Sequence, residues 1–409
     1  MSTPHPSPVS EADAMSTAAH AAEAPVEPSA AVTRRARRGM ALLISLIVVV
    51  MLALLSTGAV MSSMQDFRAG RNALVEQRAF AVAEFGLNSE ISNWDRGRNL
   101  PPPRGMAIGA IDSSNVFVAQ GDTAKVYIQR LTENTFWVRS LGRASIGNAQ
   151  LEAQRQTHMV VRIAYPSINP GGAIVTAGNI SVKGSAEITG NNTDPTGWTQ
   201  CPSIAGRDTF AITYAPGKDV DIQKPNLVTG GTNPDPTAAD SNTYVRYGTE
   251  TWNSLVANAD IKLSGGTYGP EPVGTATTCS AGTENWGEPL RGGTGHIKGC
   301  EDYFPIIYVD GNAGLSKGRG QGILLVNGDV RLNGNFQWYG LIIARDDIVK
   351  GNGTFDMWGS AMSRNASVND DNSITGNSFF RWSKCAVESA LRGSAILTRT
   401  KERSWSQLY

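Results

Sequence analysis

The chain has 409 residues, more than one compact domain usually needs, and its 36 Lys and Arg residues balance its 36 Asp and Glu residues. The formal net charge is therefore zero, and the composition gives no reason to expect a nucleic acid partner. Glycine is abundant, at 44 residues, which predicts many short strands joined by tight turns.

The N-terminal segment, residues 1–39, is predicted to be a disordered cytoplasmic leader. Most of it is rich in Ala, Ser, Pro and Glu and shows no apolar periodicity. It ends in a cluster of arginines between Arg34 and Arg38, which is followed by Gly39.

Residues 40–61 are predicted to form a transmembrane helix. No residue from Ala41 to Met61 carries a formal charge, and an α-helix needs about 20 such residues to cross a bilayer. By the positive-inside rule, the arginine cluster stays in the cytoplasm. The rest of the chain should therefore face outward.

The helix is expected to continue into water as an amphipathic extension over residues 62–97, so that one helix covers about residues 41–93. Large apolar residues recur on one side of a 3.6-residue period. These residues are Met64, Phe67, Leu74, Val82 and Phe85. We expect this side of the helix to be buried, and Pro101 to Pro103 to bar any continuation.

Residues 98–166 are predicted to form an antiparallel sheet. Polar and apolar residues alternate imperfectly over four stretches separated by turn signals. The stretches are Val116–Val118, 124–131, 136–145 and 151–164. Packing the helix on this sheet would bury one face of each.

Residues 167–397 are predicted to form a β-rich domain with coils like those of a parallel β-helix, or solenoid. Residues 174–190 align with 324–340 without a gap, and 341–359 continue the pattern; internal similarity at about 20 residues is typical of a solenoid. The alignment places Ile180, Val182 and Ile188 on Val330, Leu332 and Trp338. The residues expected to point inward are Ile174, Ile180, Val182, Leu325, Val330, Leu332, Ile342, Ile343 and Ile348.

Between the two copies, residues 191–321 are interpreted as an insertion stapled by a disulfide, because the segment is too long for a simple loop. The cysteines are Cys201, Cys279, Cys300 and Cys385, whose three possible pairings stay open. No CxxC motif favours zinc or redox chemistry. The tail, residues 398–409, is expected to pack back as an end cap or edge strand.

The N-terminal motifs resemble those of type IV pilins. Gly39 before a hydrophobic helix resembles the class III signal, in which prepilin peptidase cuts after the glycine and the new N-terminus is methylated. Phe67–Asn72 and Ala79–Leu87 resemble the PilX family of pilus assembly proteins, and the resemblance covers residues 35–95. It implies a minor pilin, and the alternative to cleavage after Gly39 is an uncleaved signal anchor. The processing residues would be Arg37, Arg38, Gly39 and Met40.

This resemblance also implies partners and a location. The partners are prepilin peptidase, other minor and major pilins, the inner-membrane assembly platform, a tip adhesin and membrane lipid. The protein would cross the bacterial inner membrane once, with its N-terminus in the cytoplasm, and would reach the surface pilus with its head in the periplasm or outside the cell.

Candidate subunit-interface residues are Ile44, Phe67 and Glu84. Most pilins carry a glutamate at the fifth mature position, where this chain has Ile44. The absence of that carboxylate fits a subunit near the filament tip and argues against a major pilin. For Glu84, simple solvation on an amphipathic helix is the alternative.

Acidic pairs at Asp346–Asp347 and Asp370–Asp371 invite a catalytic or calcium interpretation. Carboxylates at adjacent strand positions point to opposite faces, so they would not flank one glycosidic bond. Residues 369–372 are expected to form a polar turn, and cation binding by these acids stays open. His158 and His296 have no second ligand at helical or strand spacing.

Two further patterns favour structure over chemistry. Gly314–Gly318 fits the Gly-x-Ser-x-Gly pattern of hydrolases, but a glycine-rich segment follows where that motif needs a helix. Aromatic residues on the repeats are expected to fill the core or stack along strands, with glycan binding as the alternative. These residues are Phe336, Trp338, Tyr339, Phe355 and Trp358.

The sequence therefore predicts an α+β protein, in which a long N-terminal transmembrane and amphipathic helix packs on an antiparallel sheet and precedes a solenoid-like region. The expected function is assembly as a PilX-type minor pilin that supports pilus biogenesis or adhesion, without enzymatic activity, cofactor or metal. The alternatives are a membrane-anchored parallel β-helix enzyme acting on polysaccharide and a type II secretion tip pseudopilin.

Overall fold

The computed structural model describes residues 37–118, 122–146, 151–199, 201, 207–350, 353–365, 372–399 and 405–408. The predicted leader up to residue 36 lies outside these residues. The chain divides into two compact units, Met1–Gly70 and Arg71–Tyr409.

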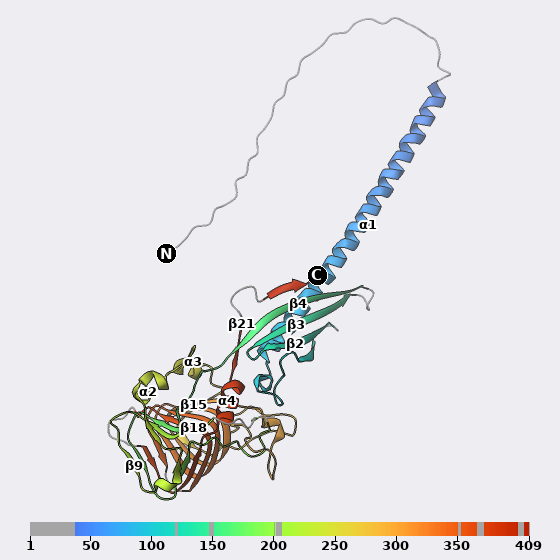
Figure 1. Ribbon diagram of the computed structural model, residues 1–409. Helices are drawn as coiled ribbons and strands as arrows, with labels where there is room; N and C mark the ends of the chain where they lie inside the picture. Colours follow the sequence, from blue (N-terminus) through green and yellow to red (C-terminus); the bar gives the residue numbers. More distant parts are fainter. Residues whose placement is uncertain are drawn as a thin grey trace, which may run out of the picture. The chain divides into compact units, whose positions relative to one another are not determined.

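Helix α1 (Arg37–Ser92) is 56 residues long, which confirms the predicted long helix (Figure 1). In the first unit its apolar side chains are exposed, for example Leu42, Leu52 and Phe67. The segment after α1 turns through a short 3₁₀ helix, η1 (Arg96–Asn99), whose Asp95 cap accepts a hydrogen bond from the Gly97 amide.

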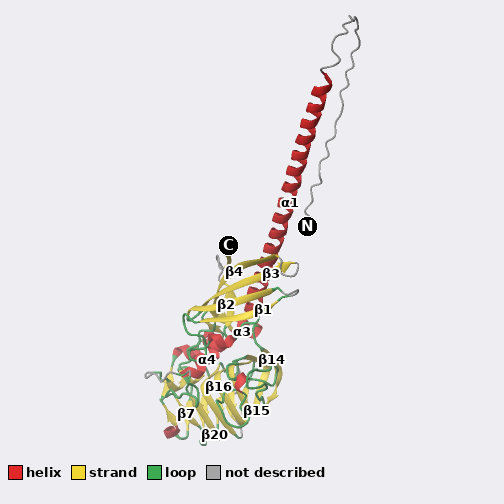
Figure 2. Cartoon of the chain, turned by 90° about the vertical axis from the view of Figure 1, so that its right-hand side faces the viewer, coloured by secondary structure: helices red, strands yellow, loops and turns green. Residues whose placement is uncertain are grey.

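An antiparallel sheet follows in the order β1–β2–β3–β4–β21, with β22 also paired to β4 (Figure 2). The four predicted strands are confirmed as the meander of the first four, and β22 places part of the tail at the edge of this sheet. The strands are β1 (Ile111–Phe117), β2 (Thr123–Thr132), β3 (Thr135–Ile146), β4 (Leu151–Ala164), β21 (Ile396–Arg399) and β22 (Trp405–Leu408).

The C-terminal part of α1 packs on the inner face of this sheet, but not through the predicted side chains. Of the five large apolar residues expected there, Val82 is buried, whereas Met64, Phe67, Leu74 and Phe85 are exposed. The buried residues are Val75, Ala79, Val82, Ala83 and Leu87.

The physical reason for this difference is close approach. A Cβ atom at Gly142 on β3 would lie 2.3 Å from the Ala79 carbonyl oxygen and 2.4 Å from the Ala83 amide nitrogen. At Gly86 a Cβ atom would lie 2.4 Å from the Ala124 Cβ. Backbone contact at these distances leaves room only for small residues, so the bulky side chains are turned away from the sheet.

Fourteen further strands form a second sheet, which curls on itself and whose described strand pairs are parallel (Figure 1). Its N-terminal strands are β5 (Gly172–Thr176), β6 (Ile180–Val182), β7 (Glu187–Thr189), β8 (Phe210–Tyr214), β9 (Val220–Ile222), β10 (Val228–Thr229) and β11 (Thr232–Pro234). The later strands are β14 (Ile261–Tyr268), β15 (Ile306–Val326), β16 (Val330–Ala344), β17 (Ile348–Lys350), β18 (Thr354–Ser363), β19 (Asn372–Ile374) and β20 (Asn377–Arg381).

Residues that the sequence repeat aligns lie on the same ladder, that is, at the same position in successive paired strands. One ladder runs Leu324, Ile342, Ala361, Ile174, Ile212. A second runs Trp338, Met357, Phe380, Ile188, Val228. The alignment had equated Ile174 with Leu324 and Ile188 with Trp338, so both pairs lie on shared ladders.

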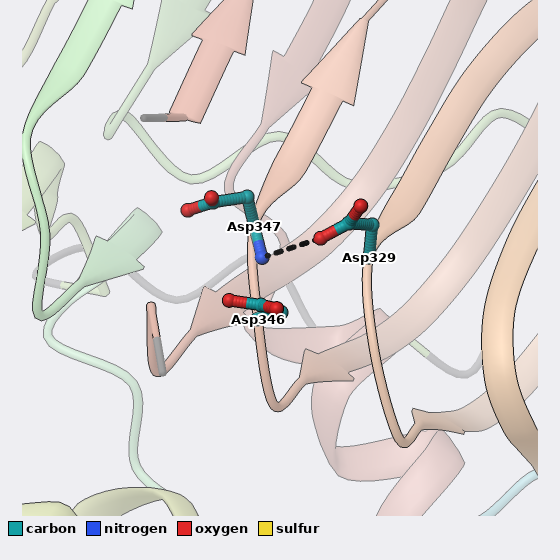
Figure 3. Close-up of side chains that lie close together, drawn as sticks. All are labelled: Asp329, Asp346 and Asp347. Carbon is teal, nitrogen blue, oxygen red and sulfur yellow. Dashed lines mark hydrogen bonds between the residues drawn. The ribbon is translucent and has the colours of Figure 1, made fainter. Parts of the chain in front are cut away.

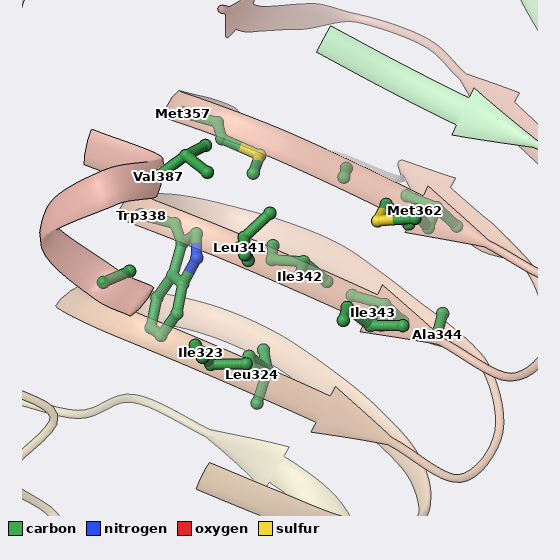
Figure 4. Close-up of a cluster of buried hydrophobic side chains, with 14 of the residues drawn as sticks. Ile323, Leu324, Trp338, Leu341, Ile342, Ile343, Ala344, Met357, Met362 and Val387 are labelled. Carbon is green, nitrogen blue, oxygen red and sulfur yellow. The ribbon is translucent and has the colours of Figure 1, made fainter. Parts of the chain in front are cut away.

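All nine residues expected to point inward are buried, at 3% exposure or less. They do not all point the same way, because Ile342 and Ile343 are consecutive on β16 and lie on opposite faces of the sheet. Helix α4 (Lys384–Gly393) covers part of the other side, where Val387 lies near Trp338 and Met357 (Figure 4). Since both sides are covered there, β15 and β16 read as continuous apolar runs, including Ile323–Val326 and Leu341–Ala344.

Paired glycines on the neighbouring strands β15, β16 and β18 allow these strands to bend at the same position. Gly322, Gly340 and Gly359 are paired in successive strands and have φ of 111°, 132° and 138°. A Cβ atom at Gly359 would lie 1.9 Å from the Gly340 carbonyl oxygen. Only glycine fits such a backbone conformation and such a contact.

Much of the segment interpreted as an insertion, residues 191–321, belongs to the curled sheet itself, because β8, β9, β10, β11, β14 and the first part of β15 all pair within it. The same segment carries α2 (Pro236–Ala239), α3 (Trp252–Ala257) and the two-stranded pair of β12 (Arg246–Tyr247) and β13 (Glu250–Thr251). The segment is rich in Gly, Pro and Asn, which have low β-strand propensity, so its short strands could not be predicted from the sequence.

Candidate functional site

Residues 40–61 of α1 satisfy the physical requirements of a membrane span. Among the described residues, α1 is the one helix long and apolar enough to cross a bilayer. Its polar side chains in this part bond to their own helix: Ser45 Oγ donates to the Leu42 carbonyl, and Ser56 Oγ and Thr57 Oγ1 donate to that of Ala53. No polar side chain there needs water, which suits a lipid environment.

The predicted processing residues lie at the start of this helix. Arg37, Arg38 and Gly39 occupy the first turn of α1, but their side chains lie outside the described part of the structure. Met40 follows with 69% of its surface exposed. Cleavage after Gly39 therefore stays a prediction.

The predicted interface residues are spread along the helix and do not form one cluster. Ile44 and Phe67 are exposed, at 57% and 66%, on the first unit. Glu84, on the second unit, is half-buried, and its backbone carbonyl accepts a hydrogen bond from the Asn88 side chain. An apolar residue at 44 removes the carboxylate that a lipid-exposed helix would have to pair.

Three acidic side chains come together at the bends that follow β15 and β16. The carboxylate oxygens of Asp329, Asp346 and Asp347 lie within 4.8 Å of one another (Figure 3). The premise that Asp346 and Asp347 lie on one strand and point apart is wrong, because both lie in the bend between β16 and β17. Asp370 and Asp371 lie outside the described residues.

The geometry of this acidic cluster suits a structural role. The Asp347 amide donates to Asp329 Oδ1 over 3.4 Å, Asn365 donates to Asp347 Oδ1, and Arg331 pairs with Asp329 Oδ2. Asp347 is fully buried and Asp329 is 7% exposed. Oxygen ligands at this spacing are of the kind that hard cations use, but a polysaccharide would not reach a buried carboxylate.

The other sequence candidates have structural roles. Ser316 of the Gly-x-Ser-x-Gly pattern lies inside β15, and its hydroxyl donates to the Tyr268 carbonyl, so the strand–turn–helix that a nucleophile needs does not occur at this motif. Phe336 and Phe355 stack with ring planes 2° apart, and Tyr339 and Trp358 stack with centroids 4.6 Å apart. The expected stacking of these aromatics is confirmed.

All four cysteines form disulfides: Cys201 with Cys385, and Cys279 with Cys300. The first joins the loop after β7 to helix α4, and the second closes a loop of the segment before β15. This selects one of the three pairings that the sequence left open.

Sequence reasoning missed a network of buried charges on the segment before β15. Glu288 is fully buried and accepts two hydrogen bonds from Arg319, at 2.8 and 2.9 Å. Arg104 reaches both Glu301 and Asp302, and His296 lies 2.7 Å from Glu301. Its members are up to 215 residues apart (319 minus 104), so no local motif announces it.

Burial and charge act against each other in this network. Burial lowers the pKa of Arg291 to about 10, although Glu301, Asp302 and Glu288 favour its charged form. Burial alone would raise the pKa of Glu301, but the hydrogen bond and charge of Arg104, with help from Arg291 and His296, bring it below its ordinary value. Arg104 and Arg291 therefore offset the cost of burying the Glu301 carboxylate.

No family model matches the chain, and no curated protein matches it. Among solved structures, it is similar to the competence-associated pilin ComZ from Thermus thermophilus. The identity is 14%, and the alignment covers 82% of this chain and 97% of that one, with a TM-score of 0.25. A TM-score of this size is too low to establish a shared fold.

Proposed function

We propose that the chain is a minor pilin of the PilX type, which is inserted in the inner membrane, cleaved by prepilin peptidase between Gly39 and Met40, and assembled into or at the tip of a type IV pilus. The observation that carries this proposal is helix α1. Its first part exposes an uninterrupted apolar surface, and its second part packs on an antiparallel sheet. The curled parallel sheet is, in this proposal, a short solenoid carried on that pilin-like base.

The apolar part of α1 explains how such a subunit would assemble. Side chains such as Leu43, Leu52 and Leu55 are more than half exposed. Covering a leucine completely is worth about 1.5–3 kcal/mol, so this surface has to lie in lipid or against other helices. Moving from the bilayer into a bundle of equivalent helices keeps it covered throughout.

Ile44 supports a special place in the filament. A carboxylate in a helix bundle is costly unless it is paired, so a subunit without an acid at this position needs no partner amine above it. The proposed partners are prepilin peptidase, other pilins and the inner-membrane platform. Catalysis forms no part of the proposal, because Asp347 is buried and Ser316 lies within a strand.

The proposal is tested by replacing Gly39 with leucine and sequencing the N-terminal peptide of the protein from sheared filaments and from membranes. We expect the wild type to begin at a methylated Met40, and the variant to keep its leader and stay in the membrane. Gly58→Leu is the matched control, since it changes a glycine of the same helix with no atom within 4 Å of the new Cβ. Protein of mature size from Gly39→Leu would contradict the proposal.

A further inference from the structure

The outer face of the antiparallel sheet carries a surface that the proposed function does not use. Side chains alternate along a strand, so residues between the buried positions of β2 and β3 point away from α1. On β2 the buried positions are Ala124, Val126, Ile128 and Arg130. We call the basic face the outward residues Lys125, Tyr127, Trp137, Arg139, Arg143 and, on β4, Arg162.

Strand pairing places these residues next to one another. Tyr127 lies opposite Arg139, and Lys125 lies opposite Leu141, which stands between Arg139 and Arg143 on β3. Arg162 lies opposite Thr135 at the other end of β3. None of the four cations of this face forms an ion pair with another described side chain, and Glu152 is the one acid among the described outward positions of β1 to β4. In a chain of zero net charge, this is a local excess of positive charge.

The aromatic rings of the basic face are already engaged by its cations. The Arg139 guanidinium lies 4.4 Å from the centre of the Trp137 ring and 5.6 Å from that of Tyr127, and Lys125 Nζ lies 5.2 Å from the Tyr127 ring. Single-stranded nucleic acids are held mainly by bases stacking on open aromatic faces. Here the rings instead hold the cations in place, which favours recognition of charge.

The distribution of the cations favours a polymer over a small ion. At about 3.4 Å per residue, Arg139 and Arg143 are roughly 14 Å apart along β3, and Arg162 lies opposite a residue a further 14 Å along it. At the Arg143 end, a cavity of about 360 Å³ is lined by Asn115, Phe117, Lys125, Tyr127, Leu141 and Arg143, among others. This volume is in the range of ligand pockets, and two cations flank an apolar lining.

We infer that the basic face binds an acidic polysaccharide, with one charged sugar unit held in the cavity between Lys125 and Arg143 and the chain continuing past Arg139 toward Arg162. The carboxylate groups of the sugar would accept hydrogen bonds from the lysine and arginines, and the apolar side of a ring would lie against Leu141 and Phe117. This inference concerns the second unit and does not depend on cleavage of the leader.

The test uses the full-length protein in detergent and measures its binding to alginate oligomers, a polyuronate, with neutral dextran as the uncharged comparison. The double variant Lys125→Gln, Arg143→Gln should raise the Kd for alginate about tenfold, because each exposed ion pair is worth up to about a factor of five. Affinity should also fall with added salt, since exposed charges are screened within about 10 Å at 0.1 M. Dextran should not bind.

The matched control is Lys218→Gln, Arg246→Gln, which removes one exposed lysine and one exposed arginine elsewhere on the same unit. It should bind alginate as the wild type does. Equal loss in both double variants, or unchanged binding in the first, would overturn the inference. So would binding of a single-stranded oligonucleotide without alginate, or self-association that depends on the basic face without alginate binding.

Discussion

The two sheets of the second unit reach a buried core by different routes. In the antiparallel sheet, the first four strands pair in sequence order, and α1 closes one face through small residues at a few close contacts. In the curled sheet, strands far apart in sequence pair, as at Ala361 and Ile174, and apolar residues repeat along each ladder. The first core depends on a few positions that must be small, and the second on repetition of many similar ones.

Disulfides sharpen this contrast, because both of them lie in the curled-sheet part of the chain. Reducing them should destabilise that part and leave the antiparallel sheet unchanged. The chain-entropy estimate is about 5 kcal/mol for the 184-residue separation of Cys201 and Cys385, and about 3 kcal/mol for the 21-residue separation of Cys279 and Cys300.

Hydrogen exchange of reduced and oxidised protein would measure this difference region by region. Peptides from β15 to β18 should lose protection on reduction, whereas peptides from β2 and β3 should not. The double variant Cys279→Ala, Cys300→Ala is the control, and it should show the smaller part of the effect. Equal loss of protection in both sheets would mean that they unfold as one unit.

Gly142→Val tests the close approach in the antiparallel sheet. The added Cβ would meet the backbone at Ala79 and Ala83, at 2.3 and 2.4 Å, and neither atom can move without shifting the helix. Overpacking of this kind costs about 3 kcal/mol, so the variant should lose stability in β2 and β3 and expose the C-terminal part of α1 to proteases.

Gly70→Ala is the matched control for this experiment, since no atom lies within 4 Å of its new Cβ. It should be neutral or stabilising, because alanine favours the helix by up to about 1 kcal/mol over glycine. If Gly142→Val keeps wild-type protease resistance, the packing of α1 on β3 is looser than these distances imply.

Periodicity made much of the fold predictable from sequence. Alternation located β2 to β4 within one residue at each end but only the last residues of β1, and the repeat matched Ile174 with Leu324 and Ile188 with Trp338 on shared ladders. Both signals are local or repetitive, so a single sequence contains them. The short strands β8 to β11 show neither clear alternation nor the repeat, so the sequence predicts them as part of an insertion.

The features that the sequence could not predict depend on contacts between residues that are far apart in the chain. The buried side of α1 is chosen by Gly142 on β3, and nothing within the helix marks Ala79 and Ala83 as contacts over Leu74 and Phe85. The acidic cluster depends on the bend between β16 and β17, where the side chains of Asp346 and Asp347 do not have to point to opposite faces as they would on a strand. The outward residues of the basic face were readable as strand positions, but their common face needed the register between strands.

The ion pairs of Arg104 connect the two sheet regions, and removing them tests whether the two regions are stable independently of each other. We expect this change to have the smallest effect of those discussed. Arg104, in the segment between α1 and β1, lies 2.5 Å from Glu301 and 2.7 Å from Asp302, which precede β15. Arg104→Gln should cost about 2 kcal/mol, because it leaves the nearly buried Glu301 carboxylate without its main charged partner. Lys183→Gln, which breaks an exposed pair with Asp221, should cost less than about 1 kcal/mol.

The pH dependence of stability distinguishes the contribution of the Arg104–Glu301 ion pair from that of apolar packing between the two sheet regions. The pKa of Glu301 lies below its ordinary value of 4.5, so at falling pH the unfolded chain takes up a proton before the folded one does. The stabilisation is present above about pH 4.5 and is lost as the pH falls through the folded pKa. In urea titrations at pH 3 to 6, Arg104→Gln should flatten this slope while Lys183→Gln keeps it. A full slope in Arg104→Gln would assign the acid sensitivity to other carboxylates and leave the two sheets coupled by packing alone.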